Sequence, residues 1–242
     1  MTSDARGPRE RLPDVQAERP EHVPAAPIRR VGVTRVRVPL RFEGRATVAE
    51  AELGVSLEGA QRGAHMSRFA EVLGSVDELS PASLRPFLGA LRERLEARSA
   101  EARFRFPTFL ERRAPVSGAT GLLDVDVELA GMDGPGGVRL TLAVEVSVAS
   151  LCPCSQAVSD YGAHNQRGRV RVRIQLAEGP APSVAELVEI AERHASAPVY
   201  PALKREDERV VTMQAFDHPA FVEDMVRGVA GSLREDPRVP AF

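Results

Sequence analysis

Residues Arg169 to Leu176 read RVRVRIQL, a strict alternation of charged or polar residues with valine, isoleucine and leucine. Successive side chains of a β-strand point to opposite faces of its sheet, so this stretch predicts a strand with one buried and one wet face. Such strands are typical of antiparallel sheets that are covered on one side. We interpret the arginines as the solvated face of this strand.

Other strands with largely alternating apolar residues are expected earlier in the chain. A first pair covers Val31 to Leu40 and Thr47 to Leu57, and a second covers Leu122 to Leu129 and Val138 to Val148. A glycine-rich run from Gly131 to Gly137 separates the second pair and predicts a turn. The sequence therefore predicts antiparallel strand pairs.

Helices are expected between the strands. Ser80 and Pro81 form a good cap and first-turn pair, and leucines recur at helical spacing at positions 84, 88, 91 and 95. Further helical patterns cover residues 67–74, 183–194 and 219–233. The predicted class is α+β, in the order strand, strand, helix, helix, strand, strand, then strand, helix, a short connection and helix.

Three regions follow from this order. Residues 1–28 carry five prolines among charged residues, a composition that predicts a flexible arm. Residues 29–137 form a first unit and residues 138–242 a second one, which resembles the first without its closing strands. We interpret the sequence as truncated at its C-terminal end.

The composition narrows the class of protein. Hydrophobic residues make up 43% of the 242 residues, and 32 basic against 34 acidic residues leave a formal net charge of -2, which gives no general attraction to nucleic acid or anionic membranes. No apolar run reaches the roughly 20 residues that a membrane helix needs, and the start lacks the apolar core of a signal peptide. We expect a cytoplasmic protein that binds neither nucleic acid nor membranes.

The densest group of reactive side chains lies in LCPCSQ, Leu151 to Gln156, and is followed by His164. A disulfide between Cys152 and Cys154 would be strained, so we interpret both as thiols kept for chemistry. Thiolate and imidazole together suit a divalent metal such as zinc, and a carboxylate from Lys204 to Glu208 is a candidate third ligand. The alternative is two buried thiols, a surface histidine and a solvated acidic loop.

Three common catalytic motifs are absent from the sequence. It contains no Walker loop, no dinucleotide-binding glycine fingerprint and no nucleophile elbow. Phosphoryl-transfer, hydride-transfer and serine-hydrolase functions therefore have no support.

Five separated motifs resemble, in the same order, those of the type IB GTP cyclohydrolases. The first combines Leu151 to Ser155 with residues 161–167, YGAHNQR, around the cysteines and the histidine. The others are GAHMSRF at residues 63–69, LKREDE at 203–208, FVED at 221–224 and LPDVQ at 12–16. The resemblance therefore runs from about residue 12 to the end of the chain.

This resemblance implies a tunnelling fold (T-fold) with two tandem ββααββ-like units, whose antiparallel sheets carry helices on one face. It also implies a homotetramer with active sites at subunit interfaces. The family opens the imidazole ring of GTP at C8, releases formate and forms 7,8-dihydroneopterin triphosphate for folate or related pterin synthesis.

The resemblance also implies roles for individual residues. Cys152, His164 and Glu208 would bind a divalent metal, Zn, Mn or Fe, and Cys154 would lie beside it as a further catalytic group. Such a metal lowers the pKa of its water from about 15.7 towards ~7 and supplies hydroxide at neutral pH. His164 would also serve in catalysis, where a histidine can move protons during ring opening.

Three more residues would contact the substrate. Glu223 would accept hydrogen bonds from the purine ring of GTP, as a carboxylate can. His65 and Arg68 would contact substrate or triphosphate, with a structural role at a helix start as the alternative.

The sequence departs from the family in two places. Met213 stands where relatives tend to have a glutamate, and the family's C-terminal strand, which carries an active-site histidine, has no counterpart. Two other functions stay open. One is a deazaguanine nitrile reductase, which uses NADPH and no metal; the other is a purine- or pterin-binding T-fold protein without catalysis.

Overall fold

The computed structural model of the chain describes residues 21–22 and 24–242. Most of the expected flexible arm, and the family-like start at residues 12–16, lie outside the described residues.

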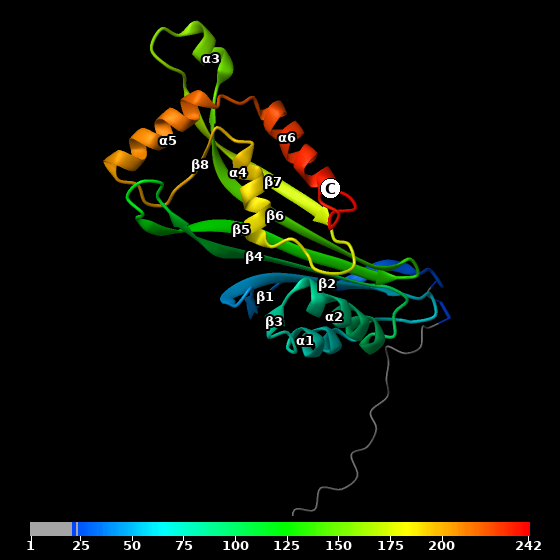
Figure 1. Ribbon diagram of the computed structural model, residues 1–242. Coiled ribbons are helices and arrows are strands. Elements are labelled where there is room, and N and C mark those ends of the chain that lie inside the picture. Colours follow the sequence, from blue (N-terminus) through cyan, green and yellow to red (C-terminus); the bar gives the residue numbers. More distant parts are fainter. Residues whose placement is uncertain (1–20, 23) are drawn as a thin grey trace, which may run out of the picture.

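One twisted sheet runs through the described chain (Figure 1). Its six long strands are neighbours in an antiparallel sheet: β1 (Ile28–Phe42), β2 (Arg45–Leu57), β4 (Ala100–Arg113), β5 (Thr120–Gly134), β6 (Gly137–Leu151) and β7 (Asn165–Gln175). Two short strands complete it: β3 (Glu78–Leu79) is parallel to β1, and β8 (Ala197–Pro198) is antiparallel to β6.

The helices of the described chain are α1 (Met66–Leu73), α2 (Pro81–Arg94), α3 (Pro153–Val158), α4 (Val184–Arg193), α5 (Arg205–Asp217) and α6 (Val222–Glu235). Four helices, α1, α2, α4 and α6, contribute side chains to one large hydrophobic core against the sheet, whereas α5 packs through a second, small cluster. The predicted α+β class is thus confirmed, and it agrees with the tunnelling fold that the resemblance implies.

The helix starts that the sequence marked are confirmed. Ser80 caps α2, because its Oγ accepts the N–H of Ser83 at 3.0 Å. Ser183 caps α4 in the same way through Glu186, whose carboxylate in turn accepts the N–H of Ser183 at 2.7 Å. In both cases the local sequence satisfies donors that the helix leaves unpaired.

The prediction missed β4, which lies between β2 and β5 at the centre of the sheet. Its alternation is clear at the start, where Ala100, Ala102, Phe104 and Phe106 are buried. Pro107 obscured it, since proline is rare in central strands. The pairing of β2 with β4 ends at Arg105, so Pro107 lies where β4 has a neighbour on one side only.

Two smaller expectations need correction. The predicted turn at Gly131 to Gly137 is shorter, because β5 continues to Gly134 and β6 starts at Gly137. The acidic run from Lys204 to Glu208 is the first turn of α5 and not a loop. The expected boundary between the two units, residues 137 and 138, falls at the start of β6, and both units contribute strands to one continuous sheet.

Two arginines of β7 form ion pairs with a buried carboxylate. Arg171 and Arg173 reach across the sheet to the carboxylate of Glu128 on β5, at 3.3 and 2.9 Å. Arg103 and Arg105 of β4 pair with the same carboxylate, whose side chain is only 6% exposed. Burial opposes ionisation of Glu128, but these guanidinium groups outweigh it and hold the pKa of Glu128 below its usual value.

Candidate active site

The paired ends of β6 and β7 bring two predicted ligands together. Leu151 is the last residue of β6 and pairs with Asn165, the first residue of β7. One step further, the N–H of Cys152 donates to the carbonyl oxygen of His164 at 3.1 Å. Cys152 is half-buried and His164 is exposed. The antiparallel register therefore places a thiol and an imidazole on neighbouring chain segments.

The short helix α3 fixes the chain between these two residues and projects from the body of the molecule (Figure 1). Pro153 lies in the first helical turn, where a backbone N–H would have no partner within the helix, so proline is tolerated there. The N–H of Gln156 donates to the carbonyl of Cys152 at 3.1 Å, and Ser155 Oγ accepts the N–H of His164 at 3.2 Å. Cys154 is exposed on this turn, beside Cys152 in the chain.

Helix α5 carries the predicted third ligand, Glu208, in its first turn. Val211 and Ala215, which follow Glu208 at helical spacing, belong to a small apolar cluster with Leu151. Glu208 thus lies on the face of α5 that turns towards the end of β6, and its side chain is exposed.

The neighbouring Asp207 is fully buried and anchors the start of α5. Its carboxylate accepts the N–H groups of Val116, Ser117 and Lys204 at 2.8 to 2.9 Å, and the Ser117 hydroxyl at 2.5 Å. Burial opposes its ionisation, yet these donors hold the pKa of Asp207 well below the usual range. Asp207 belongs to the run from Lys204 to Glu208 that was a candidate for the third metal ligand, and its role as an anchor was not expected.

The described part of the chain brings together Cys152 and His164 but no complete metal site. Within residues 21–22 and 24–242, no group of three histidine, cysteine or acidic side chains lies close enough to hold an ion. The donors present nevertheless suit a borderline-soft divalent metal, because the two residues whose backbones are hydrogen-bonded at this strand end carry a free thiol and an imidazole.

Glu223 lies in the first turn of α6, where a negative charge favours the helix. The start of α6 is tied to the end of β6, since the N–H of Ala220 donates to the carbonyl of Leu151 at 3.2 Å. Ser150 Oγ also donates to the carbonyl of Ala220 at 3.2 Å. These bonds hold the chain segment of Glu223 close to that of Cys152, and Glu223 itself is exposed.

His65 and Arg68 lie in the other half of the sheet. His65 precedes α1, which packs against β1 and α2, and three strands separate β1 from β6. The guanidinium of Arg68 donates to the carbonyl of Arg94 and to Glu96, both at 3.1 Å. These bonds tie α1 to the end of α2, which supports the structural alternative for Arg68.

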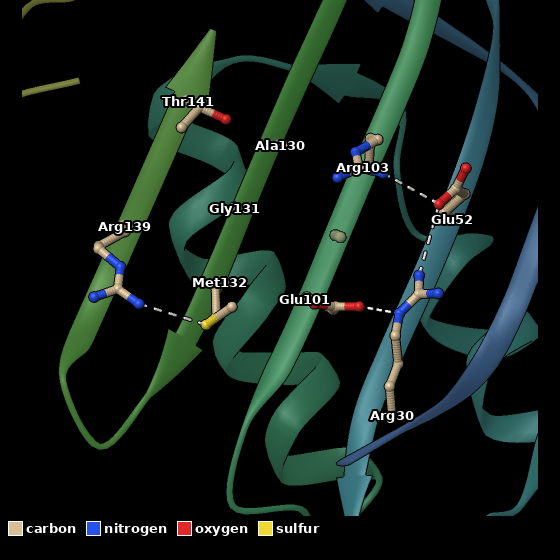
Figure 2. A pocket seen from close by; sticks show the side chains of 10 residues that line it. Arg30, Glu52, Glu101, Arg103, Ala130, Gly131, Met132, Arg139 and Thr141 are labelled. Atoms are coloured by element: carbon tan, nitrogen blue, oxygen red, sulfur yellow. Dashed lines mark hydrogen bonds and ion pairs between the residues drawn. The ribbon is translucent and has the colours of Figure 1, made fainter. Parts of the chain in front are cut away.

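Several hollows lie on the described part of the molecule, and two of them have a volume of about 430 Å³ each. One faces the uncovered side of β1, β2, β4, β5 and β6 and contains none of the predicted site residues; Figure 2 shows Arg30 and Arg103 paired there with Glu52. The other is an apolar groove between β7 and α6, lined by Val222 and Val226 beside the position of Glu223. Only the second hollow adjoins a predicted substrate contact.

The chain matches the family described as type I GTP cyclohydrolase folE2 over residues 12–242. It is 45% identical to a GTP cyclohydrolase FolE2 of Paraburkholderia xenovorans, over 96% of this chain and 87% of the relative. It is 43% identical to a GTP cyclohydrolase FolE2 of Methylococcus capsulatus, over 89% of this chain and 82% of the relative. A relative of the same name from Desulfovibrio desulfuricans is 44% identical, over 96% of this chain and 90% of its own length.

Among the residues that the structure describes, none of the helices combines the length and the apolar character that crossing a bilayer requires.

Proposed function

Because this chain belongs to the type I GTP cyclohydrolase FolE2 family, we propose that it is a GTP cyclohydrolase of folate biosynthesis. The observation that carries this function is the match over residues 12–242, which includes the Cys152 and His164 segments that the fold places side by side. The enzyme opens the imidazole ring of GTP and yields formate and 7,8-dihydroneopterin triphosphate.

The metal site is part of this proposal. Cys152, His164 and Glu208 would hold one divalent ion, Zn, Mn or Fe, and their mixed sulfur, nitrogen and oxygen donors suit all three. When bound, such an ion supplies a water whose pKa is lowered from about 15.7 towards ~7. The position of Glu208 on the α5 face that turns towards β6 supports its inclusion.

The remaining residues bind substrate and move protons. Glu223 accepts hydrogen bonds from the N–H and amino donors of the guanine ring, beside the apolar groove between β7 and α6. Cys154, which is exposed, and the imidazole of His164 would exchange protons as the ring opens. His65 and Arg68 would act on the triphosphate only from another copy of the chain or another part of the assembly.

We also propose that the active enzyme is a homo-oligomer, a tetramer. The segment around α3 projects from the molecule, and its apolar side chains Val158 and Tyr161 are 87% and 100% exposed. Apolar side chains so fully exposed on a projecting segment fit a protein interface. Sedimentation analysis of the parent protein and of Tyr161→Ser tests this: a monomeric parent protein would contradict it.

The function is tested with purified protein supplied with Mn²⁺, Fe²⁺ or Zn²⁺ in turn. We expect one formate for each GTP consumed, together with a product that oxidises to a fluorescent neopterin. NADPH oxidation with a deazaguanine nitrile is not expected. A folded, assembled protein that binds guanine nucleotides but releases no formate with any metal would instead be a binding protein.

A further inference from the structure

The sheet divides at the end that carries Cys152. The pairing of β5 with β6 ends at Asp126 and Glu145, so the last six residues of β6 have left β5. Their other side is still occupied by β7, which pairs with β6 as far as Leu151. The two residues of β8 therefore pair with β6 on the side that β5 has vacated, at Val148 and Ala149.

Ser196, directly before β8, extends this short pairing by one step. Its N–H donates to the carbonyl of Ala149 at 3.0 Å, as a strand partner would. Its side-chain Oγ accepts the N–H of Leu151 at 2.9 Å. Ser196 is 0% exposed and Leu151 only 5%, so no water replaces either bond. The hydroxyl thus takes the place of a missing strand neighbour.

Leu151 is the last residue before the chain leaves the sheet at Cys152. The N–H of Leu151 is hydrogen-bonded to Ser196 and its carbonyl oxygen to Ala220, so both backbone polar groups of Leu151 are fixed. The next N–H, that of Cys152, is bound to His164. The direction in which Cys152 leaves the sheet is therefore set by three hydrogen bonds, and only the one from Ser196 uses a side chain.

We propose that Ser196 is a positioning residue, which holds Leu151 so that the thiol of Cys152 is directed to the site shared with His164. The effect of Ser196 on catalysis rests on the proposed function. The placement of Cys152 can be measured without turnover. Groups that orient a metal ligand typically change metal affinity or activity by about 10–100-fold when they are removed.

The test compares Ser196→Ala with Ser56→Ala. Ser56 Oγ likewise accepts a backbone N–H from another segment, that of Ser99 at 3.0 Å, and it lies on β2, far from Cys152 along the sheet. Each variant loses one bond of the same kind, and Ser56 is only half-buried, so a purely structural role predicts a larger loss of stability in Ser196→Ala but no specific change at Cys152. Ser196→Thr retains the hydroxyl and serves as the rescue.

Two readouts report on Cys152 itself. The first is the affinity for Co²⁺, followed by the thiolate-to-metal absorption. The second is the rate at which a disulfide reagent labels Cys152 in metal-free protein with Cys154→Ala, which leaves one thiol in the chain. We expect Ser196→Ala to bind Co²⁺ at least about tenfold more weakly than Ser56→Ala, to change the labelling rate several-fold, and to lower kcat more than it raises KM.

Equal Co²⁺ affinity and equal labelling rate in Ser196→Ala and Ser56→Ala would overturn the proposal. If Ser196→Ala does not fold, Ser196→Cys keeps the shape with a weak acceptor, and the effects on kcat and KM decide, because an added thiol would disturb Co²⁺ binding and labelling. A parent protein that binds no Co²⁺ would reject the metal site of the proposed function. The labelling rate of Cys152 would then decide the positioning role alone.

Discussion

The N–H of Cys152 donates a 3.1 Å hydrogen bond to the carbonyl oxygen of His164, where β6 and β7 end. Two residues twelve positions apart in the sequence thus become neighbours through the register of one hairpin. A metal held by this pair needs both donors, because catalytic zinc sites generally use three protein ligands. This pairing predicts the effect of substitutions at Cys152 and at His164.

Cys152→Ala and His164→Ala should each remove bound metal and activity together, as the loss of one of three ligands requires. Cys154→Ala should lower turnover more than metal content, because Cys154 is exposed on α3 and outside the proposed ligand set. Elemental analysis beside the formate assay measures both. Full metal occupancy in Cys152→Ala would show that the ligand assignment is wrong.

Glu128→Gln should destabilise the sheet at neutral pH by on the order of 2 kcal/mol, the scale of hydrogen bonds to charged groups. The pKa of Glu128 is lowered in the folded protein, so its charge stabilises the fold above its unfolded pKa of about 4.3. That contribution is lost as the pH falls through the folded value. Urea unfolding of both proteins at pH 7 and in acid should show the difference shrinking.

Glu145→Gln is the control for this experiment. Glu145 pairs with one arginine, Arg169, whose side chain is 71% exposed, so its loss should cost less than about 1 kcal/mol. An equal effect of the two substitutions would mean that the four arginines around Glu128 add nothing.

Gly228→Ala should destabilise the packing of α6 on α4. A Cβ at Gly228 would lie 2.3 Å from Nδ1 of His194, whose other ring nitrogen is hydrogen-bonded to Ser232 at 2.8 Å. Overpacking of this kind costs typically about 1–3 kcal/mol. Thermal unfolding measures it, and activity should fall as well because α6 carries Glu223.

Gly231→Ala in the same helix should have the opposite effect. A Cβ there meets no atom within 4 Å, so alanine should stabilise α6 by about 0.4–1 kcal/mol through the unfolded chain. Stabilisation by both substitutions would indicate that helix propensity, and not the contact with His194, governs this segment.

Local signals made much of the fold predictable. Ser80 and Ser183 mark helix starts by hydrogen bonds to residues three positions away. The alternating residues of β7 predict which of its side chains are buried. Strand β4 was missed because of Pro107, since only the sheet register shows that the pairing of β2 with β4 stops before that residue. Whether proline is tolerated in a strand depends on a neighbour that is distant in the sequence.

The candidate site was also predictable only where its residues lie close together in the sequence. Cys152 and His164 could be grouped because they flank one turn, whereas Ser196 and Asp207 act through hydrogen bonds to residues 45 and about 90 positions away. Short polar residues in such roles have no periodic pattern, so the sequence alone could not distinguish them from surface residues. The ion pairs of Glu128 were equally hard to predict, because its four arginine partners come from two strands, β4 and β7, on opposite sides of β5.

The exposed first turn of α6 offers a test between a substrate anchor and an ordinary surface carboxylate. Glu223→Gln keeps the shape and one acceptor of the side chain but adds donors that oppose the donors of guanine. Losing one charge-assisted hydrogen bond costs about 1.5–3 kcal/mol, and ~1.4 kcal/mol is a factor of ten in affinity. We therefore expect at least about a tenfold loss in affinity for GTP, with metal content and fold retained.

Asp224→Asn is the matched control, because Asp224 follows in the same turn and its carboxylate already pairs with Arg227 at 2.8 Å on the helix surface. It should bind GTP as the parent protein does. Calorimetric titration with a guanine nucleotide analogue that is not hydrolysed measures both variants. Since the bonds that hold Ala220 to Leu151 and Ser150 are unchanged in either variant, a difference between them reports on the carboxylate of Glu223 and not on the placement of α6. Equal affinities would leave Glu223 as one of the exposed acidic residues of a helix start.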